Sequence, residues 1–162
     1  MGGVGMSLGN ITPSAEFNIY VDPHAANIVL QSGLPLVMMG LDVTHKVKVN
    51  DQIIDNIKKN GNKTSEFFAD LMNFYSKFHR KLYETDETPL HDPCVIAYLI
   101  DPSIFQGKYV NVQVEEESLL TRGTTVVDWW GVTGRTPNCL VMIEADHKKF
   151  FSLLSTELKK LN

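Results

Sequence analysis

The 162-residue sequence predicts an α/β fold, because short β-branched runs alternate with longer segments whose apolar residues recur at helical spacing. Apolar residues make up 43% of the chain and charged residues 21%, a composition typical of a folded globular protein rather than a disordered one. This is enough apolar material for one ordinary core, so we expect a single domain over residues 1–162.

The first forty residues predict a helix followed by a strand. Residues 22–32 begin with an Asp-Pro pair, which suits the first turn of a helix, and they end before Gly33. The apolar run 36–39 lies between a proline and a glycine, which predicts a buried strand. Helix followed by strand is the pattern of the α/β class.

Three more helices are predicted in the middle of the chain. Residues 51–59 repeat isoleucine at helical spacing, and residues 64–83 carry a longer apolar stripe. A compact helix begins at Pro93 and ends before Asp101, with Asp92 at its N-cap, where the carboxylate faces the positive helix end. The stripe of the long helix consists of Phe67, Phe68, Leu71, Met72, Phe74, Tyr75 and Phe78.

The last third of the chain predicts strands and a final helix. Residues 109–115 alternate valines with polar residues, and residues 124–128 resemble their partner, which indicates a small antiparallel piece. Residues 138–144 form one more strand, and residues 146–161 an amphipathic helix. We find no internal repeat and no low-complexity linker.

Charge and composition limit the partners. A net charge of −4 and a pI near 5.7 argue against nucleic acid, whose binders usually carry a basic patch. No apolar run approaches the roughly 20 residues that span a bilayer, and the N-terminus lacks the features of a signal peptide. Cys94 and Cys139 match neither a dense disulfide framework nor a CxxC pair, so we expect buried, reduced thiols. We therefore expect a cytoplasmic protein with small-molecule or protein partners.

Residues 9–18 are dense in polar groups. Glu16 and Asn18 lie two apart, so in an extended segment they point to the same side, and Asn10 adds another amide. This arrangement suits a sugar with vicinal hydroxyls, because each hydroxyl both donates and accepts hydrogen bonds. The alternative, which spacing alone favours, is a helix-capping loop built on Glu16 and the nearby hydroxyls of Thr12 and Ser14.

Residues 89–93 form a second polar group, Pro-Leu-His-Asp-Pro. His91 can give or take a proton near neutrality, and Asp92 is a hard oxygen donor suited to calcium. Adjacent side chains point in different directions, so one can face a metal ion and the other a leaving group. The alternative is that Asp92 is only an N-cap and His91 a polar loop residue.

Four motifs, in this order, resemble those of the inosine-uridine-preferring nucleoside hydrolases. They are Met-Gly-Gly at the start, residues 9–26, Gly-Leu-Asp-Val-Thr-His at 40–45, and Pro-Leu-His-Asp-Pro at 89–93. The resemblance runs over essentially the whole chain, yet covers only about the second half of the family's usual length. It implies the C-terminal part of a Rossmann-like nucleoside hydrolase fold, with a mainly parallel sheet flanked by helices.

The resemblance also implies functional roles. In the family, a calcium ion holds the ribose hydroxyls and the attacking water; Asp92 corresponds to one of its ligands. His91 corresponds to the acid that helps to protonate the departing base, at least in purine-accepting members. Tyr75 and His79 are four apart on one helix face, in the region that lines the nucleobase pocket, although core packing is the stronger interpretation of Tyr75. The ribose contacts correspond to Asn10, Glu16 and Asn18, with Phe17 near the sugar and base.

Cleavage of an N-glycosidic bond requires stabilisation of an oxocarbenium-like sugar, an activated water and a route for the electrons of the leaving base. Glu16 suits the first task and His91 the third, but nothing suits the second. Asp51 and Asp55 lie on an amphipathic helix, and residues 115–117 form a solvated charged run. One carboxylate cannot supply the roughly six to eight oxygen ligands of calcium, so the calcium site is incomplete in this chain.

We therefore expect the C-terminal half of a purine or pyrimidine ribonucleoside hydrolase, inactive alone, or one chain of a split enzyme that a complementing N-terminal half completes. A second hypothesis is a non-catalytic module that binds ribose or a nucleoside. A third is a fragment that forms a homo-oligomer through apolar surface that its missing half covers. No membrane partner is expected.

Overall fold

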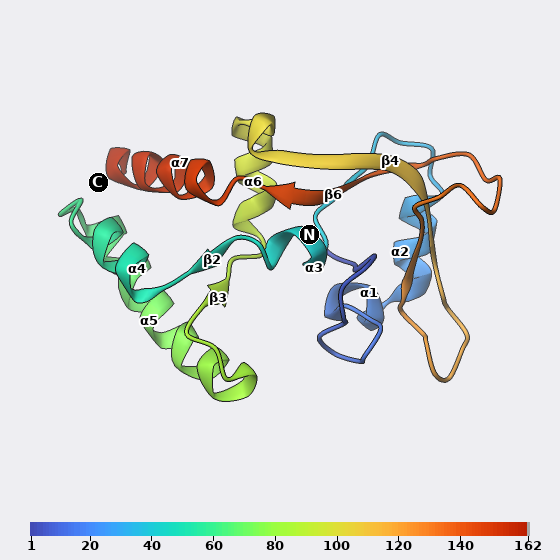
Figure 1. Cartoon of the computed structure of the whole chain (residues 1–162), viewed down its shortest axis with the longest axis horizontal. Helices are drawn as coiled ribbons and strands as arrows, with labels where there is room; N and C mark the ends of the chain where they lie inside the picture. The colour runs from blue at the N-terminus through green and yellow to red at the C-terminus, as the bar shows by residue number, and fades with distance from the viewer. Residues whose placement is uncertain (162) are drawn as a thin grey trace. The chain divides into compact units, whose positions relative to one another are not determined.

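The computed structural model describes residues 1–161, apart from the side chains of residues 82 and 83. The chain forms two compact units (Figure 1), which we call the sheet unit, residues 1–44 and 105–144, and the helical unit, residues 45–104 and 145–161. No helix among the described residues is long and apolar enough to cross a membrane.

A four-stranded sheet in the order β1-β6-β4-β5 organises the sheet unit. Strands β1 and β6 are parallel, whereas β4 and β5 are antiparallel, with Val112 opposite Val127 and Val114 opposite Thr125. The predicted α/β class is therefore confirmed, and so is the antiparallel piece whose two strands the alternating pattern indicated. The strands are β1 (Val37–Met38), β4 (Phe105–Val114), β5 (Thr125–Asp128) and β6 (Cys139–Ala145).

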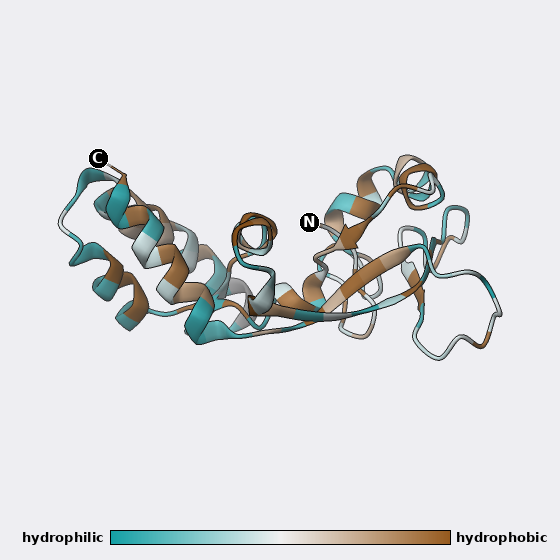
Figure 2. Cartoon of the chain, turned by 90° about the horizontal axis from the view of Figure 1, so that it is seen from above, coloured by the Kyte–Doolittle hydropathy of each residue, from teal (hydrophilic) through white to brown (hydrophobic). Residues whose placement is uncertain are grey.

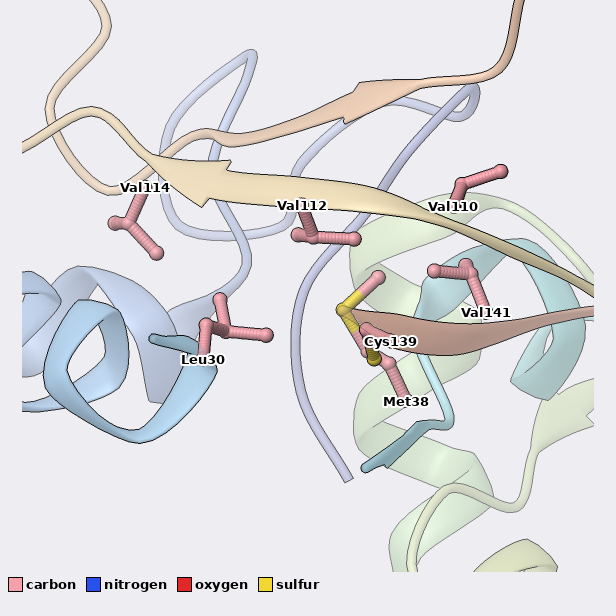
Figure 3. Packing of buried hydrophobic residues seen from close by; sticks show 7 residues of the cluster. All are labelled: Leu30, Met38, Val110, Val112, Val114, Cys139 and Val141. Carbon is pink, nitrogen blue, oxygen red and sulfur yellow. The ribbon is translucent and has the colours of Figure 1, made fainter. Parts of the chain in front are cut away.

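The core of the sheet unit lies on one face of β4. Val110, Val112 and Val114 alternate along the strand, so all three point to the same face, and each is at most 8% exposed. Figure 3 shows Val112 and Val114 on the side of β4 where Leu30 lies. The complete cluster contains Leu30, Met38, Val110, Val112, Val114, Cys139 and Val141.

Short helices connect the strands of the sheet unit. The predicted helix at 22–32 is confirmed: Asp22 caps it by accepting a hydrogen bond from the backbone N–H of Ala25 (2.9 Å), and Gly33 follows it with a left-handed φ of 75°. Two helices were not predicted, since five and four residues are too few to show a helical period. The helices are α1 (Phe17–Val21), α2 (Pro23–Leu30) and α3 (Leu41–Thr44).

The helical unit contains the other predicted helices. Asn50 and Asn62 cap the two that follow them, accepting hydrogen bonds from the backbone N–H groups of Ile53 and Ser65. A two-stranded antiparallel sheet, β2-β3, was missed because each strand has only two residues. The elements are β2 (Lys48–Val49), α4 (Asp51–Lys58), α5 (Lys63–Tyr83), β3 (Thr88–Pro89), α6 (Pro93–Ile100), the 3₁₀ turn η1 (Pro102–Ile104) and α7 (His147–Lys160).

Only part of the predicted apolar stripe of α5 is buried. Met72 is 8% exposed, whereas Phe67, Phe74 and Phe78 are 66–76% exposed. The periodicity correctly indicated a helix, but it did not distinguish the side that packs in this chain from the side that faces outward.

Both cysteines are free and buried, as expected. Burial raises the pKa of the Cys139 thiol to about 11, so the reactive thiolate is scarce at neutral pH. We predict that a disulfide reagent such as Ellman's modifies neither Cys94 nor Cys139 in the folded chain at neutral pH, and modifies both in concentrated guanidinium chloride. Rapid labelling of the native chain would contradict this burial.

Candidate functional site

A tight loop brings the polar segment of the sheet unit together. Gly9 donates to the Pro13 carbonyl (3.0 Å), and the Thr12 hydroxyl accepts from the backbone N–H of Ala15 (2.9 Å). A Cβ on Gly9 would lie only 2.3 Å from the Thr12 carbonyl oxygen, so the close approach of the two backbones requires glycine. The loop places Asn10 beside the start of α1.

Glu16 follows this loop directly and is only 2% exposed. As the N-cap of α1, its carboxylate accepts hydrogen bonds from the backbone N–H of Asn18 (3.0 Å) and of Gly3 (3.1 Å). The capping alternative is thus observed.

The remaining residues of the predicted ribose site surround Glu16 and are exposed. The Asn10 side-chain oxygen accepts from the backbone N–H of Phe17 (2.9 Å), and the Asn18 amide donates to the Met1 carbonyl (3.3 Å). Phe17 is 51% exposed. The structure therefore brings together all four predicted residues, which we call the α1 group: Asn10, Glu16, Phe17 and Asn18. Its geometry differs from the extended segment that we expected, because Glu16 is extended whereas Phe17 and Asn18 belong to α1.

Sequence reasoning missed the role of Asp42, a residue within the Gly-Leu-Asp-Val-Thr-His motif. Its carboxylate is 5% exposed and accepts hydrogen bonds from the backbone N–H groups of Gly5 (2.6 Å), Met6 (2.9 Å) and Ser7 (2.7 Å). It therefore holds the glycine-rich loop that precedes the α1 group. No local pattern shows this role, because the bonded residues lie at least 35 positions away.

In the helical unit, the β2-β3 pair positions two histidines. The strands are antiparallel, with Lys48 opposite Pro89, so the segment before β2, which contains His45, and the segment after β3, which contains His91, lie at the same end. The ring centroids of His45 and His91 are 5.7 Å apart. His45 is the last residue of the Gly-Leu-Asp-Val-Thr-His motif at 40–45, but no role was predicted for it.

Tyr75 and His79 extend this group along one face of α5, as their spacing predicted, with ring centroids 6.2 Å apart. Burial, followed by the charge of Lys48, lowers the pKa of His79. The pKa of His91 is also lowered, chiefly by burial, although the neighbouring Asp92 charge acts in the opposite direction. We call these residues, with Asp92, the histidine group: His45, Tyr75, His79, His91 and Asp92.

Asp92 occupies the predicted N-cap position of α6, but its carboxylate accepts no capping hydrogen bond. The interpretation that Asp92 serves only as a cap is therefore wrong for its side chain. The backbone explains the difference, because Asp92 has helical dihedral angles (φ −61°, ψ −35°) rather than the extended ones of a typical N-cap. The Asp92 side chain is exposed.

The residues present do not form a calcium site by themselves. Among the described residues, no cluster of three or more His, Cys, Asp or Glu side chains is arranged to hold a metal ion. Asp92 offers one carboxylate, whereas calcium takes about six to eight oxygen ligands.

Two solved structures that match this chain are described as nucleoside hydrolases. A purine-preferring ribonucleoside hydrolase from Gardnerella vaginalis superimposes with a TM-score of 0.88 and 31% identity, over 99% of this chain and 51% of that one. The plant nucleoside hydrolase PpNRh1 superimposes with a TM-score of 0.86 and 28% identity, over 98% of this chain and 52% of that one.

The family model described as inosine-uridine preferring nucleoside hydrolase matches residues 1–152. The chain therefore belongs to the inosine-uridine preferring nucleoside hydrolase family. Among curated relatives, the pyrimidine-specific ribonucleoside hydrolase RihA of Salmonella schwarzengrund is 48% identical over 160 residues, and RihA of Escherichia coli K12 is 46% identical. Each match covers 98% of this chain but 51% of the relative, so the chain spans about half the length of these enzymes.

Proposed function

We propose that this chain is the substrate-recognition half of a ribonucleoside hydrolase, which splits a nucleoside with water into ribose and a free base once the other half of the domain is present. The observation that carries the proposal is the α1 group, in which exposed Asn10, Phe17 and Asn18 surround the buried carboxylate of Glu16. Its relatives are named for pyrimidine or purine nucleosides, so we propose the ribonucleoside class without a base preference.

Each part of the α1 group suits one part of a ribonucleoside. The amides of Asn10 and Asn18 can donate to and accept from vicinal ribose hydroxyls, and the Phe17 ring offers an apolar face to the sugar or base. Glu16 supplies negative charge where an oxocarbenium-like sugar becomes positive, so its attraction increases on the way to the transition state.

The histidine group suits the leaving base. A base that departs with its bonding electrons needs a hydrogen-bond donor or a proton, and His91 carries ring nitrogens that can provide either. Because burial lowers its pKa, the neutral ring with one N–H donor is its main form at neutral pH in this chain. Tyr75 and His79 offer ring surfaces for the base.

The calcium that the family resemblance implies does not fit the residues of this chain alone, so we assign no chemical step to it. We predict that calorimetric titration of the isolated chain with calcium chloride shows no binding tighter than about millimolar, since weak extracellular calcium modules with several ligands bind only in about that range. Micromolar binding that Asp92→Ala abolishes would show a metal site that the described side chains do not reveal.

Hydrolysis of uridine and inosine tests the proposal. The chain is assayed alone and after co-expression with the half of E. coli RihA that lies outside the match. We expect no hydrolysis by the chain alone and hydrolysis of at least one nucleoside by the pair. Hydrolysis by the chain alone would overturn the requirement for another half, and a silent pair whose chains co-purify would overturn the hydrolase proposal.

The second candidate function is a non-catalytic module for ribose or a nucleoside. It is favoured by the combination of an assembled α1 group with the absence of a metal cluster among the described side chains. Calorimetric titration of the chain with ribose and with inosine separates the two, using Asn10→Ala as the variant. Heat that Asn10→Ala removes, together with a silent pair, would favour this module over the hydrolase.

A further inference from the structure

An apolar groove of about 400 Å³ lies within the helical unit, between α6 and α7. Ile96, Ala97 and Ile100 line it from α6, and Phe150, Leu153 and Leu154 from α7. Asp92 and Glu157 also line it. None of the six apolar residues belongs to the α1 group or the histidine group, so the proposed function leaves this groove unexplained.

The helix beside the groove has the composition of an internal helix. From Pro93 to Ile100, α6 contains no charged residue, and Figure 2 shows it end-on as hydrophobic. Ile96, Leu99 and Ile100 nevertheless are 58%, 72% and 54% exposed. A helix that is apolar all round is normally buried, and contiguous exposed apolar surface indicates an interaction site. We call Ile96, Leu99, Ile100 and the groove the α6 surface.

We propose that the α6 surface is the docking site for the half of a nucleoside hydrolase domain that this chain does not span. This inference rests on the proposed function. The chain matches the G. vaginalis enzyme with a TM-score of 0.88 but covers 51% of it, so in that enzyme about as much chain again accompanies the part that matches. The E. coli relative likewise contains about as much chain again.

The position of Asp92 favours this occupant over others. Asp92 immediately precedes α6, lines the groove and makes no capping hydrogen bond. The Asp92 carboxylate is exposed at the edge of the groove. A half-domain seated on the α6 surface lies next to this carboxylate and can supply a polar partner for it.

Co-purification tests the docking site. The chain is co-expressed with a tagged polypeptide that consists of the half of E. coli RihA outside the match, and the ratio of the two chains on the affinity resin is measured. The variant is Ile96→Gln/Ile100→Gln, and the matched control is Leu119→Gln/Leu120→Gln, which changes two apolar residues of 106% and 85% exposure in the sheet unit. Circular dichroism checks that each variant folds, which the exposure of all four side chains favours.

We expect near-equal recovery of the two chains for the wild type and the control, and at least about a tenfold lower recovery for the α6 variant, because truncated or polar anchors in a docking site commonly cost that much affinity. Failure of the wild type to co-purify overturns the proposal. The proposal is also overturned if the α6 variant and the wild type recover equal amounts of the partner chain. The same holds if recovery is lost with Phe74→Gln/Phe78→Gln on α5 and not with the α6 variant.

The test separates docking from chemistry. A pair that forms through the α6 surface but hydrolyses no nucleoside supports the docking site and overturns the hydrolase proposal. If the pair hydrolyses a nucleoside and its co-purification is unchanged by Ile96→Gln/Ile100→Gln, the hydrolase proposal is supported and the docking site is overturned. Sedimentation of the chain alone tests a second copy as the occupant: a dimer that the α6 variant converts to a monomer overturns the proposal.

Discussion

Replacing Asp42 with alanine is expected to lower the free energy of unfolding by about 2–4 kcal/mol, because it removes a charge-assisted acceptor from three backbone N–H groups and leaves them without that partner. Asp42 is 5% exposed, and its partners are Gly5, Met6 and Ser7. Urea denaturation measures the change. The expected loss is a large part of the stability of a domain of this size.

Two variants control this prediction. Asp55→Ala removes an exposed carboxylate from α4, and we expect a change within about 0.5 kcal/mol. Asp42→Asn keeps one side-chain acceptor, so we expect a loss between those of the wild type and Asp42→Ala. If Asp42→Ala and Asp55→Ala have equal stabilities, the three hydrogen bonds do not hold the loop.

Replacing Asp92 with alanine is expected to lower kcat/KM for nucleoside hydrolysis by the co-expressed pair at least about a hundredfold, equivalent to about 2.7 kcal/mol of transition-state stabilisation. The same change is expected to alter the unfolding free energy of the isolated chain by less than about 0.5 kcal/mol, since the carboxylate makes no capping hydrogen bond. This contrast between activity and stability distinguishes a functional carboxylate from a structural one. Steady-state kinetics and urea denaturation provide the two measurements.

The control for Asp92 lies at the other end of the same helix. Asp101 follows α6, and its carboxylate accepts a hydrogen bond from the backbone N–H of Ser103 (3.0 Å). We expect Asp101→Ala to reduce kcat/KM of the pair by less than about threefold, because this carboxylate already has a structural partner. A comparable loss for both variants would mean that Asp92 acts through the stability of α6 rather than in the site.

The chain's local elements were predictable from sequence because their signals are local. Asp22 before Pro23 predicted α2, and the alternating valines predicted β4 and its pairing with β5. Four motifs in order indicated the family, and the family model confirms it over residues 1–152. The four residues of the α1 group were also predicted from the sequence as one group.

Other features depend on contacts between residues far apart in the chain. No local pattern shows that Glu16 is buried against Gly3, that Asp42 binds the loop at residues 5–7, or that His45 lies beside His91. The uncapped carboxylate of Asp92 follows from its backbone dihedral angles, which the Asp-Pro pair alone does not specify.

Local patterns therefore predicted the α/β class, most helices, one strand pair and the family, because periodicity, caps and motifs act over a few residues. The folded chain was needed to show which carboxylates accept hydrogen bonds from backbone N–H groups, which carboxylate has no such bond at its helix, and which face of each helix is covered. Burial and hydrogen bonding depend on partners that folding brings from distant positions, and these partners are not encoded in any single segment.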